Sequence, residues 1–259
     1  MHDFHVHSNY SDGGFLSRMV RAAADAGLDA VGFADHCNVS SRDPMQDVRA
    51  VFGFNLDRTY ERRRHGIERL RERADVTVYD AVEMDYDPRD EADIRSFLGD
   101  VDFDYAIGSV HGVGEYNVQS PRQFEGLSDA ELDAFVDRYF DNLVALAESE
   151  LFDVAAHPDL FERTPQLRGR ATVDHYRRAA EAFADSRTVP EINAGRALRE
   201  EQVVHPDETF LDELLARDVA VTVGTDSHSP DEIADRASFL QSFVSDRGID
   251  PVGPPSLDE

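Results

Sequence analysis

Two histidines and an aspartate lie close together near the start of the chain. The stretch DFHVHSNYSDG places His5 and His7 two residues apart, and Asp12 follows five residues after the second histidine. In a β-strand, residues i and i+2 project from the same side, so both imidazoles can reach one point in space. Imidazole nitrogens and a carboxylate are typical metal ligands. An HxH pair alone also occurs at ordinary polar strand ends, so the rest of the chain has to supply further ligands.

Six further candidate ligands each follow an apolar stretch of the β type. They are His36 in FADHCN, Glu83 in AVEMDY, His111 in IGSVHG, His157 in VAAHPD, and Asp226 and His228 in VTVGTDSHS. A ligand set without thiolate favours Zn, Mn or Fe over a structural zinc finger. One ion takes roughly four to six ligands, so nine side chains predict two or three divalent ions that share a bridging carboxylate. Two such ions, about 3.5–4 Å apart, can hold a hydroxide and clamp a phosphoryl group.

A regular alternation of strands and helices would bring these ligands to one rim. Apolar runs predict strands at residues 3–6, 30–34, 76–82, 105–109, 153–156, 188–193 and 219–224. Three-to-four spacing predicts helices at residues 16–26, 58–74, 90–98, 129–150, 173–185, 209–217 and 230–244. Seven strand–helix units predict an α/β fold whose parallel sheet closes into a barrel. The loops after the strands build the site of such a barrel.

The chain is expected to form a single barrel domain over residues 1–246, followed by a proline-rich tail over residues 247–259 that is loose at its end. Two connections, 38–55 and 112–127, are long, and long loops in compact domains are often functional. We find no internal repeat and no low-complexity linker.

Acidic residues dominate the charge. The chain has 53 acids against 26 bases, and its formal net charge is −27. All of the bases are arginine, and the acids are spread along the whole length, which favours a role in solvation at high salt over a partner-binding block. We therefore expect a halophilic host and no nucleic-acid partner. With one cysteine, no membrane-length apolar run and no signal segment, we expect a soluble, cytoplasmic protein.

The motifs HVHSNYSDG, ADH, SVHG, AHPD and GTDSH, with the glutamate Glu83, resemble those of the polymerase and histidinol phosphatase (PHP) family, from His5 to His228. The resemblance implies a distorted (β/α)7 barrel. It also implies three ions, held by His5, His7, Glu83 and Asp226, by Glu83, His111 and His157, and by Asp12, His36 and His228. The ligands Glu83, Asp226 and His228 would have catalytic roles at this centre.

Within the family, the stretches VEMDYDPRDEADIRSFLGDVDFDYAIGSVHG, LFDVAAHPDLFER and EINAGRALRE resemble monofunctional histidinol-phosphate phosphatases. This resemblance implies hydrolysis of L-histidinol phosphate by a metal-bridging hydroxide. Arg163, with Arg196 or Arg199, would orient the phosphate through bidentate contacts. Two features depart from that pattern: Gly13 stands where many of these phosphatases have histidine, and EINAGRALRE is one residue longer than usual.

Several alternatives remain open from the sequence. The substrate could be another small phosphorylated metabolite, a nucleotide or an oligonucleotide end, or the chain could be a non-catalytic metal-binding module. The arginines could be surface ion-pair residues, and the oligomeric state is not predicted. Four histidines outside the motifs are expected on the surface or in loops, namely His2, His65, His175 and His205. Cys37 is expected to be a buried, inert thiol.

Overall fold

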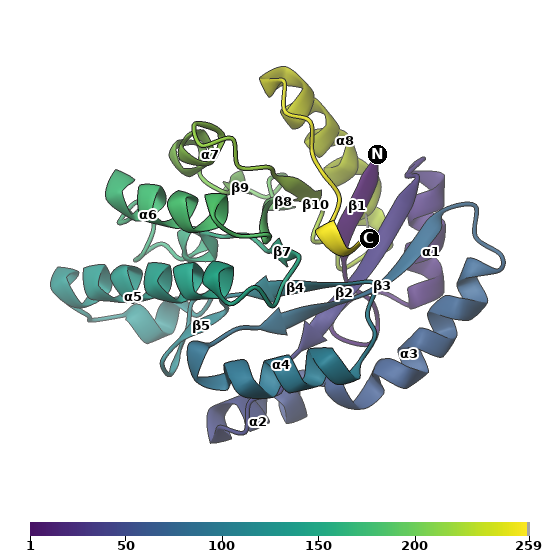
Figure 1. The fold of residues 1–259 in the computed structure, drawn as a ribbon, viewed down its shortest axis with the longest axis horizontal. Coiled ribbons are helices and arrows are strands. Elements are labelled where there is room, and N and C mark those ends of the chain that lie inside the picture. Colours follow the sequence, from purple (N-terminus) through teal and green to yellow (C-terminus); the bar gives the residue numbers. More distant parts are fainter. Residues whose placement is uncertain (258–259) are drawn as a thin grey trace.

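Seven parallel strands form a curled sheet (Figure 1). The computed structural model describes residues 1–257, without the side chains of residues 43 and 44. The strand order is β1 (His2–Val6), β2 (Ala30–Cys37), β3 (Thr77–Asp85), β4 (Tyr105–Ser109), β7 (Val154–Ala155), β8 (Val189–Arg196) and β10 (Thr222–Gly224). The two outer strands meet, because the His7 amide donates to the Ser227 carbonyl at 3.0 Å and the Asp226 amide donates to the His5 carbonyl at 2.8 Å. The predicted distorted (β/α)7 barrel is therefore confirmed.

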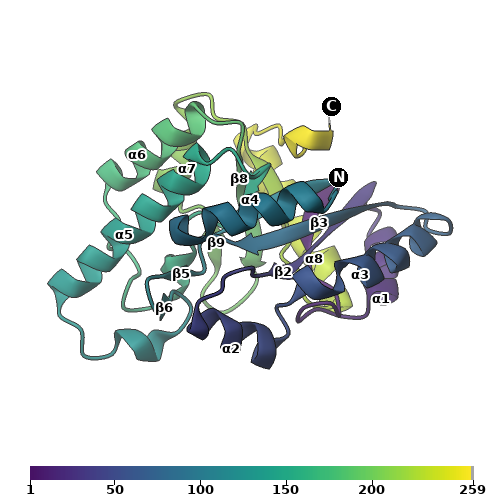
Figure 2. The same ribbon diagram turned by 60° about the horizontal axis from the view of Figure 1, so that its bottom comes forward.

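Helices surround the outside of this sheet, as the view in Figure 2 shows from a second side. They are α1 (Leu16–Asp25), α3 (Leu56–Arg71), α4 (Glu91–Asp100), α5 (Asp129–Glu148), α6 (Val173–Ala184), α7 (Glu208–Leu215) and α8 (Pro230–Arg247). Helix α8 begins with a capping box between Ser229 and Glu232, with Pro230 in its first turn. Among the described residues, no helix combines the length and the apolar character that a membrane span requires.

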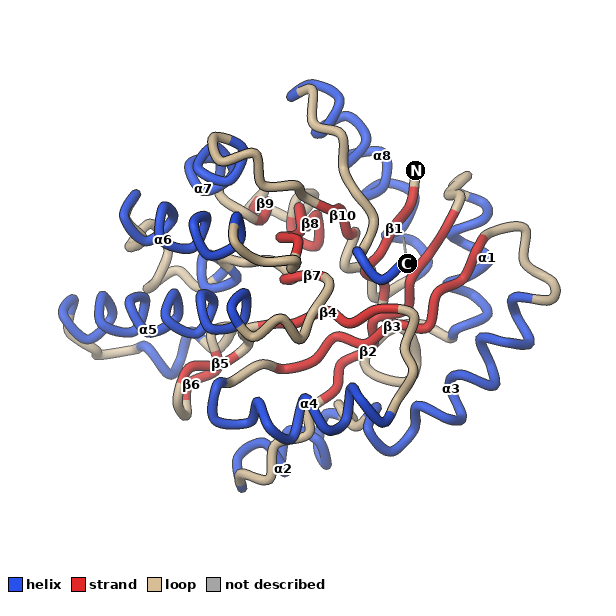
Figure 3. The backbone as a smooth tube through the Cα atoms, viewed as in Figure 1, coloured by secondary structure: helices blue, strands red, loops and turns tan. Residues whose placement is uncertain are grey.

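Both long connections contain secondary structure that the apolar periodicity did not predict (Figure 3). The first holds α2 (Asp43–Phe52), and the second holds the hairpin of β5 (Gly112–Val113) and β6 (Tyr116–Asn117), followed by the 3-10 turn η2 (Pro121–Phe124). The short strand β9 (Val203–His205) pairs antiparallel with β8. Further 3-10 turns are η1 (Pro88–Asp90), η3 (Leu160–Arg163) and η4 (Pro255–Leu257).

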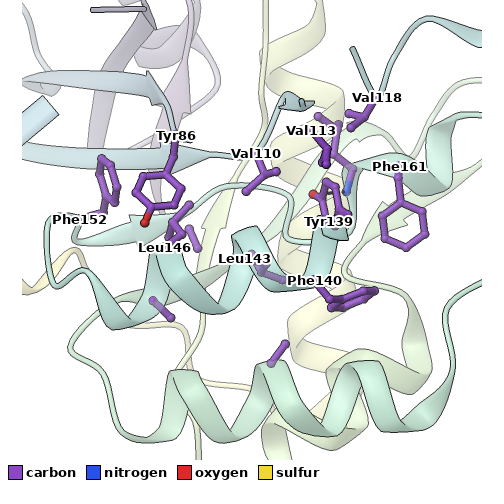
Figure 4. Packing of buried hydrophobic residues seen from close by; sticks show 14 of the residues in the cluster. Tyr86, Val110, Val113, Val118, Tyr139, Phe140, Leu143, Leu146, Phe152 and Phe161 are labelled. Atoms are coloured by element: carbon purple, nitrogen blue, oxygen red, sulfur yellow. Dashed lines mark hydrogen bonds between the residues drawn. The ribbon is translucent and has the colours of Figure 1, made fainter. Parts of the chain in front are cut away.

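The largest apolar cluster lies between α5, α6 and the sheet (Figure 4). Tyr139 and Leu143 of α5 are buried there, and Phe140 packs edge-on against Phe161 at 5.7 Å between ring centroids. Burying a side chain of this size stabilises the fold by about 1.5–3 kcal/mol. This packing anchors η3, which carries Arg163.

The C-terminal tail lies against the barrel at the amino ends of its strands. The Val252 amide donates to the Val221 carbonyl at 2.9 Å, and the Ser256 hydroxyl donates to Asp153. Leu257 packs against the buried cluster that contains Phe4. The expected loose end itself, residues 258–259, lies outside the described residues, and the boundary at residue 246 stays a prediction.

Candidate metal centre

Glu83, at the carboxyl end of β3, lies in the middle of the predicted ligands. Its Oε2 atom lies 2.7 Å from Nδ1 of His36, 3.4 Å from Nε2 of His5 and 3.6 Å from Nε2 of His7. All four side chains are buried or nearly so. Since β1, β2 and β3 are neighbours in a parallel sheet, their carboxyl ends place these groups side by side.

The other carboxylate oxygen of Glu83 faces a different pair of imidazoles. Oε1 lies 3.1 Å from Nε2 of His157 and 3.3 Å from Nε2 of His111, and it accepts a hydrogen bond from the Ser109 hydroxyl at 2.6 Å. The two oxygens thus point toward two groups of ring nitrogens. This is the geometry that a bridging carboxylate needs.

Asp12 and Asp226 complete the arrangement. Asp12 Oδ1 lies 3.4 Å from Nε2 of His228 and 3.8 Å from Nε2 of His36. Asp226 Oδ1 lies 3.3 Å from Nε2 of His7 and 3.6 Å from Nδ1 of His228. All nine predicted ligands therefore converge. The groups whose ligand atoms all lie within 4.8 Å of one another are His7, Asp12, His36 and His228; His5, His7 and Glu83; and His36, Glu83 and His111.

The hydrogen bonding of these groups tests whether divalent cations fit. Glu83 Oε2 and His36 Nδ1 are both buried, and neither has a hydrogen-bond partner of acceptable geometry among the described residues, although they lie 2.7 Å apart. A buried polar atom without a partner costs about 1–3 kcal/mol. A cation coordinated by oxygen and ring nitrogen would remove that cost. The donor set, made of imidazole and carboxylate, suits Zn, Mn or Fe.

A buried carboxylate holds the loop that carries Asp12. Asp35 Oδ1 accepts from the Ser8 amide at 2.6 Å and from the Ser11 hydroxyl at 2.8 Å, and its Oδ2 accepts from Nη1 of Arg63 at 2.8 Å. The loop also passes close to its own start, because a Cβ atom at Gly13 would lie 2.4 Å from the His7 carbonyl carbon. A histidine at position 13 would not fit this loop conformation.

A second buried carboxylate joins the first strand of the barrel, β1, to the residue that follows the last strand, β10. Asp3 accepts from the Thr225 amide at 3.0 Å and from its hydroxyl at 2.6 Å, and it also accepts from the His5 amide at 3.3 Å. Burial raises the pKa of Asp3 to about 6. These bonds fix β1, which carries His5 and leads directly into His7, against Thr225, the residue that precedes Asp226.

Two of the predicted ligand histidines have a carboxylate on their other ring nitrogen. Nδ1 of His5 lies 2.8 Å from Oε1 of Glu191, and Nδ1 of His111 makes a short contact with Oδ1 of Asp85. Such carboxylates orient metal-binding imidazoles and raise their basicity. Neither carboxylate was predicted as part of the site from the sequence. Asp85 stands two residues after Glu83 on the same strand, and Glu191 is a charged residue inside a buried strand, so each gave a usable signal.

The electrostatics of the site follow from burial and from the carboxylates. Burial lowers the pKa of His7 and of His157 to about 4, so both are neutral. Burial alone would also lower the pKa of His111, but Glu83 and Asp85 raise it to about 10. The surrounding histidines hold the pKa of Glu83 well below its usual range against the opposing effect of burial. Neutral imidazoles and ionised carboxylates are the forms that bind metal, and a cation would displace the proton of His111.

A cavity of about 610 Å³ opens above this centre. All three predicted arginines, Arg163, Arg196 and Arg199, line it. Arg163 donates through Nη2 to Asp226 Oδ2 at 3.1 Å, whereas Arg199 pairs with Glu232 at 2.7 Å.

The two long connections, 38–55 and 112–127, which were expected to be functional, also contribute to the wall of this cavity. From the α2 segment come Met45, Val48, Phe52 and Phe54, and from the hairpin come Glu115 and Tyr116.

Comparison with known protein families identifies this architecture. The PHP domain model matches residues 3–195, which include seven of the nine converging ligands. The chain belongs to the PHP domain family. It is an enzyme of the hydrolytic PHP type, and its distorted (β/α)7 barrel agrees with the resemblance noted from the motifs.

Relatives of this PHP protein include a probable histidinol-phosphatase of Deinococcus radiodurans, which is 26% identical over 235 residues, covering 88% of this chain and 85% of that protein. Two solved structures share the fold. The putative histidinol phosphatase of Listeria monocytogenes has a TM-score of 0.74 at 16% identity, covering 92% of this chain and 99% of that one. The histidinol phosphate phosphatase of Lactococcus lactis, solved with zinc, L-histidinol and phosphate, has a TM-score of 0.76 at 18% identity, covering 97% and 95%.

The PHP chain departs from the sequence-based expectation at His205. We expected a surface or loop histidine, but its side chain is fully buried and its Nε2 atom lies 2.9 Å from Nε of Arg163. The prediction that Cys37 is a buried thiol is confirmed. Burial also raises the pKa of this thiol.

Proposed function

We propose that this PHP protein is a phosphomonoesterase that hydrolyses L-histidinol phosphate to L-histidinol and phosphate, with two or three divalent cations at the nine-ligand centre. The observation that carries the proposal is the position of that centre at the floor of a cavity whose wall includes Arg163, Arg196 and Arg199. Cation ligands next to guanidinium groups form an environment for a dianionic phosphate.

The resemblance to the PHP family implies a particular division of the ligands, and the distances within each group agree with it, although His36 Nδ1 also lies 2.7 Å from Glu83 Oε2. One cation would be held by His5, His7, Glu83 and Asp226, a second by Glu83, His111 and His157, and a third by Asp12, His36 and His228. Glu83, with its two oxygens facing two groups of histidines, would join the first two. When bound, such cations polarise phosphoryl oxygens and lower the pKa of water so that it can attack phosphorus near neutral pH.

The protein side chains would bind and orient the substrate. Arg163 already donates to Asp226 Oδ2 and to Asn193 Oδ1, so its guanidinium is held beside a proposed ligand. A phosphate oxygen that Arg163 binds would therefore lie next to the centre. The ammonium group of L-histidinol phosphate needs an acidic partner, and Glu115 of the hairpin lines the same cavity.

The relatives support the choice of substrate. The Deinococcus protein is described as a probable histidinol-phosphatase, and the Lactococcus structure contains zinc, L-histidinol and phosphate. The formal net charge of −27 disfavours a nucleic-acid substrate, because binding of nucleic acid depends on neutralised phosphates. The same net charge supports the proposal that the enzyme acts in the salt-rich cytoplasm of a halophilic host.

A substrate panel tests the proposal. The purified protein, loaded with Mn²⁺ or Zn²⁺ in high salt, would be assayed for phosphate release from L-histidinol phosphate, nucleoside monophosphates and simple phosphorylated alcohols, and for cleavage of an end-labelled single strand of DNA. We expect kcat/KM for L-histidinol phosphate to exceed that for every other substrate by at least about tenfold. Preference for the nucleotides or for the DNA strand would overturn the substrate assignment, and no hydrolysis of any substrate would overturn the activity.

A further inference from the structure

A line of buried hydrogen bonds runs from Asp159 through His205 to Arg163. His205 Nδ1 lies 2.6 Å from Oδ1 of Asp159, and its Nε2 lies 2.9 Å from Nε of Arg163. Asp159 and His205 are fully buried. The other oxygen of Asp159 accepts from the Asp207 amide at 2.6 Å, so the carboxylate is fixed at both oxygens. The line therefore joins η3, which carries Arg163, to β9 and the segment that follows it.

The chemistry of these partners sets the proton positions on His205. A guanidinium nitrogen can only donate, so Nε2 of His205 has to accept and carries no proton. Its Nδ1 then carries the proton and donates it to Asp159. Burial and the adjacent Arg163 cation hold the pKa of His205 well below its usual range, which agrees with a neutral ring. A neutral ring locked between two fixed partners does not shuttle protons; it fixes the direction of the guanidinium.

Arg163 uses its remaining donors at the site. Its Nη2 atom donates to Asn193 and to Asp226, and among residues 1–257 no hydrogen bond from Nη1 is found. The side chain lines both the main cavity and a smaller adjacent cavity of about 180 Å³. An unrestrained arginine would lose several rotamers when it binds a ligand, and this loss of conformational entropy would weaken binding.

We propose that His205, itself oriented by Asp159, is a positioning residue that holds the Arg163 guanidinium ready to bind the phosphoryl group. This inference rests on the proposed phosphomonoesterase function and adds to it a residue pair that touches neither substrate nor cation. Its consequence is specific: loss of the His205 acceptor weakens the binding of phosphate only as long as Arg163 is present.

A double-mutant cycle tests this coupling. In the metal-loaded full-length protein, we would measure inhibition by inorganic phosphate and KM and kcat for L-histidinol phosphate, for wild type, His205→Leu, Arg163→Ala and the double variant. We expect His205→Leu to weaken phosphate binding and raise KM by about 3- to 10-fold, with metal content unchanged. Adding His205→Leu to Arg163→Ala should change neither the inhibition constant for phosphate nor KM for L-histidinol phosphate. His205→Gln, whose side-chain oxygen can accept from Arg163, should recover most of the loss. His65→Leu, at a histidine that is 70% exposed, is the matched control.

Each result bears on a separate claim. Equal effects of His205→Leu with and without Arg163 would overturn the positioning role, as would a failure of His205→Gln to recover binding. A wild-type protein that hydrolyses no phosphomonoester would overturn the proposed function and this inference together, whereas an Arg163 effect without a His205 effect would overturn the inference alone. If His205→Leu does not fold, ¹⁵N spectra of the wild-type histidines decide: we expect the neutral Nδ1–H form for His205, and a protonated Nε2 would contradict it.

Discussion

Oε1 of Glu191 lies 2.8 Å from Nδ1 of His5, and both side chains are buried. Glu191 comes from β8 and His5 from β1, strands on either side of β10 in the curled sheet. The other oxygen of Glu191 accepts from the His157 amide at 3.0 Å. One carboxylate thus orients ligands of two proposed cations.

Replacement of Glu191 should weaken metal binding without removing any proposed ligand. We expect Glu191→Gln to lower the affinity for Zn²⁺ or Mn²⁺ by about 10- to 100-fold, because the imidazole of His5 loses its anionic partner. The measurement is a competition titration with a chelator of known affinity. Glu61→Gln, at an exposed position, is the control. An affinity equal to that of wild type would show that Glu191 has no such role.

A methyl group at position 224 should disturb the same contact. A Cβ atom on Gly224 would lie 1.9 Å from Oε1 of Glu191 and 2.6 Å from Cβ of His5. We expect Gly224→Ala to lower the free energy of unfolding by about 1–3 kcal/mol and to reduce the metal content. Gly99→Ala is the matched control, since nothing lies within 4 Å of its Cβ position and it stands in helix α4. It should be neutral or stabilise by up to about 1 kcal/mol. Equal stability of the two variants in urea would contradict the packing argument.

Glu162 should make stability depend on pH. Burial raises its pKa from 4.5 to about 7. The folded protein therefore binds this proton more tightly than the unfolded chain, and the contribution of Glu162 to the free energy of unfolding falls as pH rises from about 4.5 to about 7. Above pH 7 we expect Glu162→Gln to be more stable than wild type by on the order of 1 kcal/mol, after allowance for solvent screening.

Urea unfolding of wild type and Glu162→Gln at pH 5 and pH 8 measures this difference. Other groups titrate in both proteins and cancel in the comparison. The gain in the variant should be larger at pH 8 than at pH 5. A gain that is the same at both pH values, or larger at pH 5, would rule out the assignment to Glu162.

Salt should stabilise the fold. At a formal net charge of −27, the folded chain repels itself, and the screening length falls from about 10 Å at 0.1 M salt to about 3 Å at 1 M. We expect Tm to rise by several °C between 0.1 M and 2 M KCl. A variant with Asp235, Asp246 and Asp250 changed to Asn removes three exposed acids and should show a smaller rise. A Tm that is flat or falls with salt would contradict the halophilic interpretation.

The sequence predicted the parts of the fold and site that depend on local patterns. The apolar runs ended close to where β1, β2 and β3 end, and therefore His5, His36 and Glu83 could be assigned to one rim before any contact was known. The helix periodicity likewise predicted a helix over residues 129–150, where the structure has α5. Ligand positions follow strand ends because all the strands are parallel.

The remaining features depend on contacts between distant segments. His205 lies 42 residues from Arg163 in sequence, and nothing in VVHPD distinguishes a buried acceptor from a loop histidine. The partner of His5, Glu191, is 186 residues away. Helix α2 was missed because its short apolar pattern faces the cavity wall, through Met45, Val48 and Phe52, rather than the core.

The most direct test of the central claim is a metal titration of the chelator-stripped protein, followed by phosphate release from L-histidinol phosphate. We expect no turnover without metal and a rate that rises until two or three Zn²⁺ or Mn²⁺ ions are bound per chain. Glu83→Gln should bind fewer ions and stay inactive at every metal concentration. Turnover by the metal-free protein, or a Glu83→Gln variant that reaches the wild-type rate, would contradict the account.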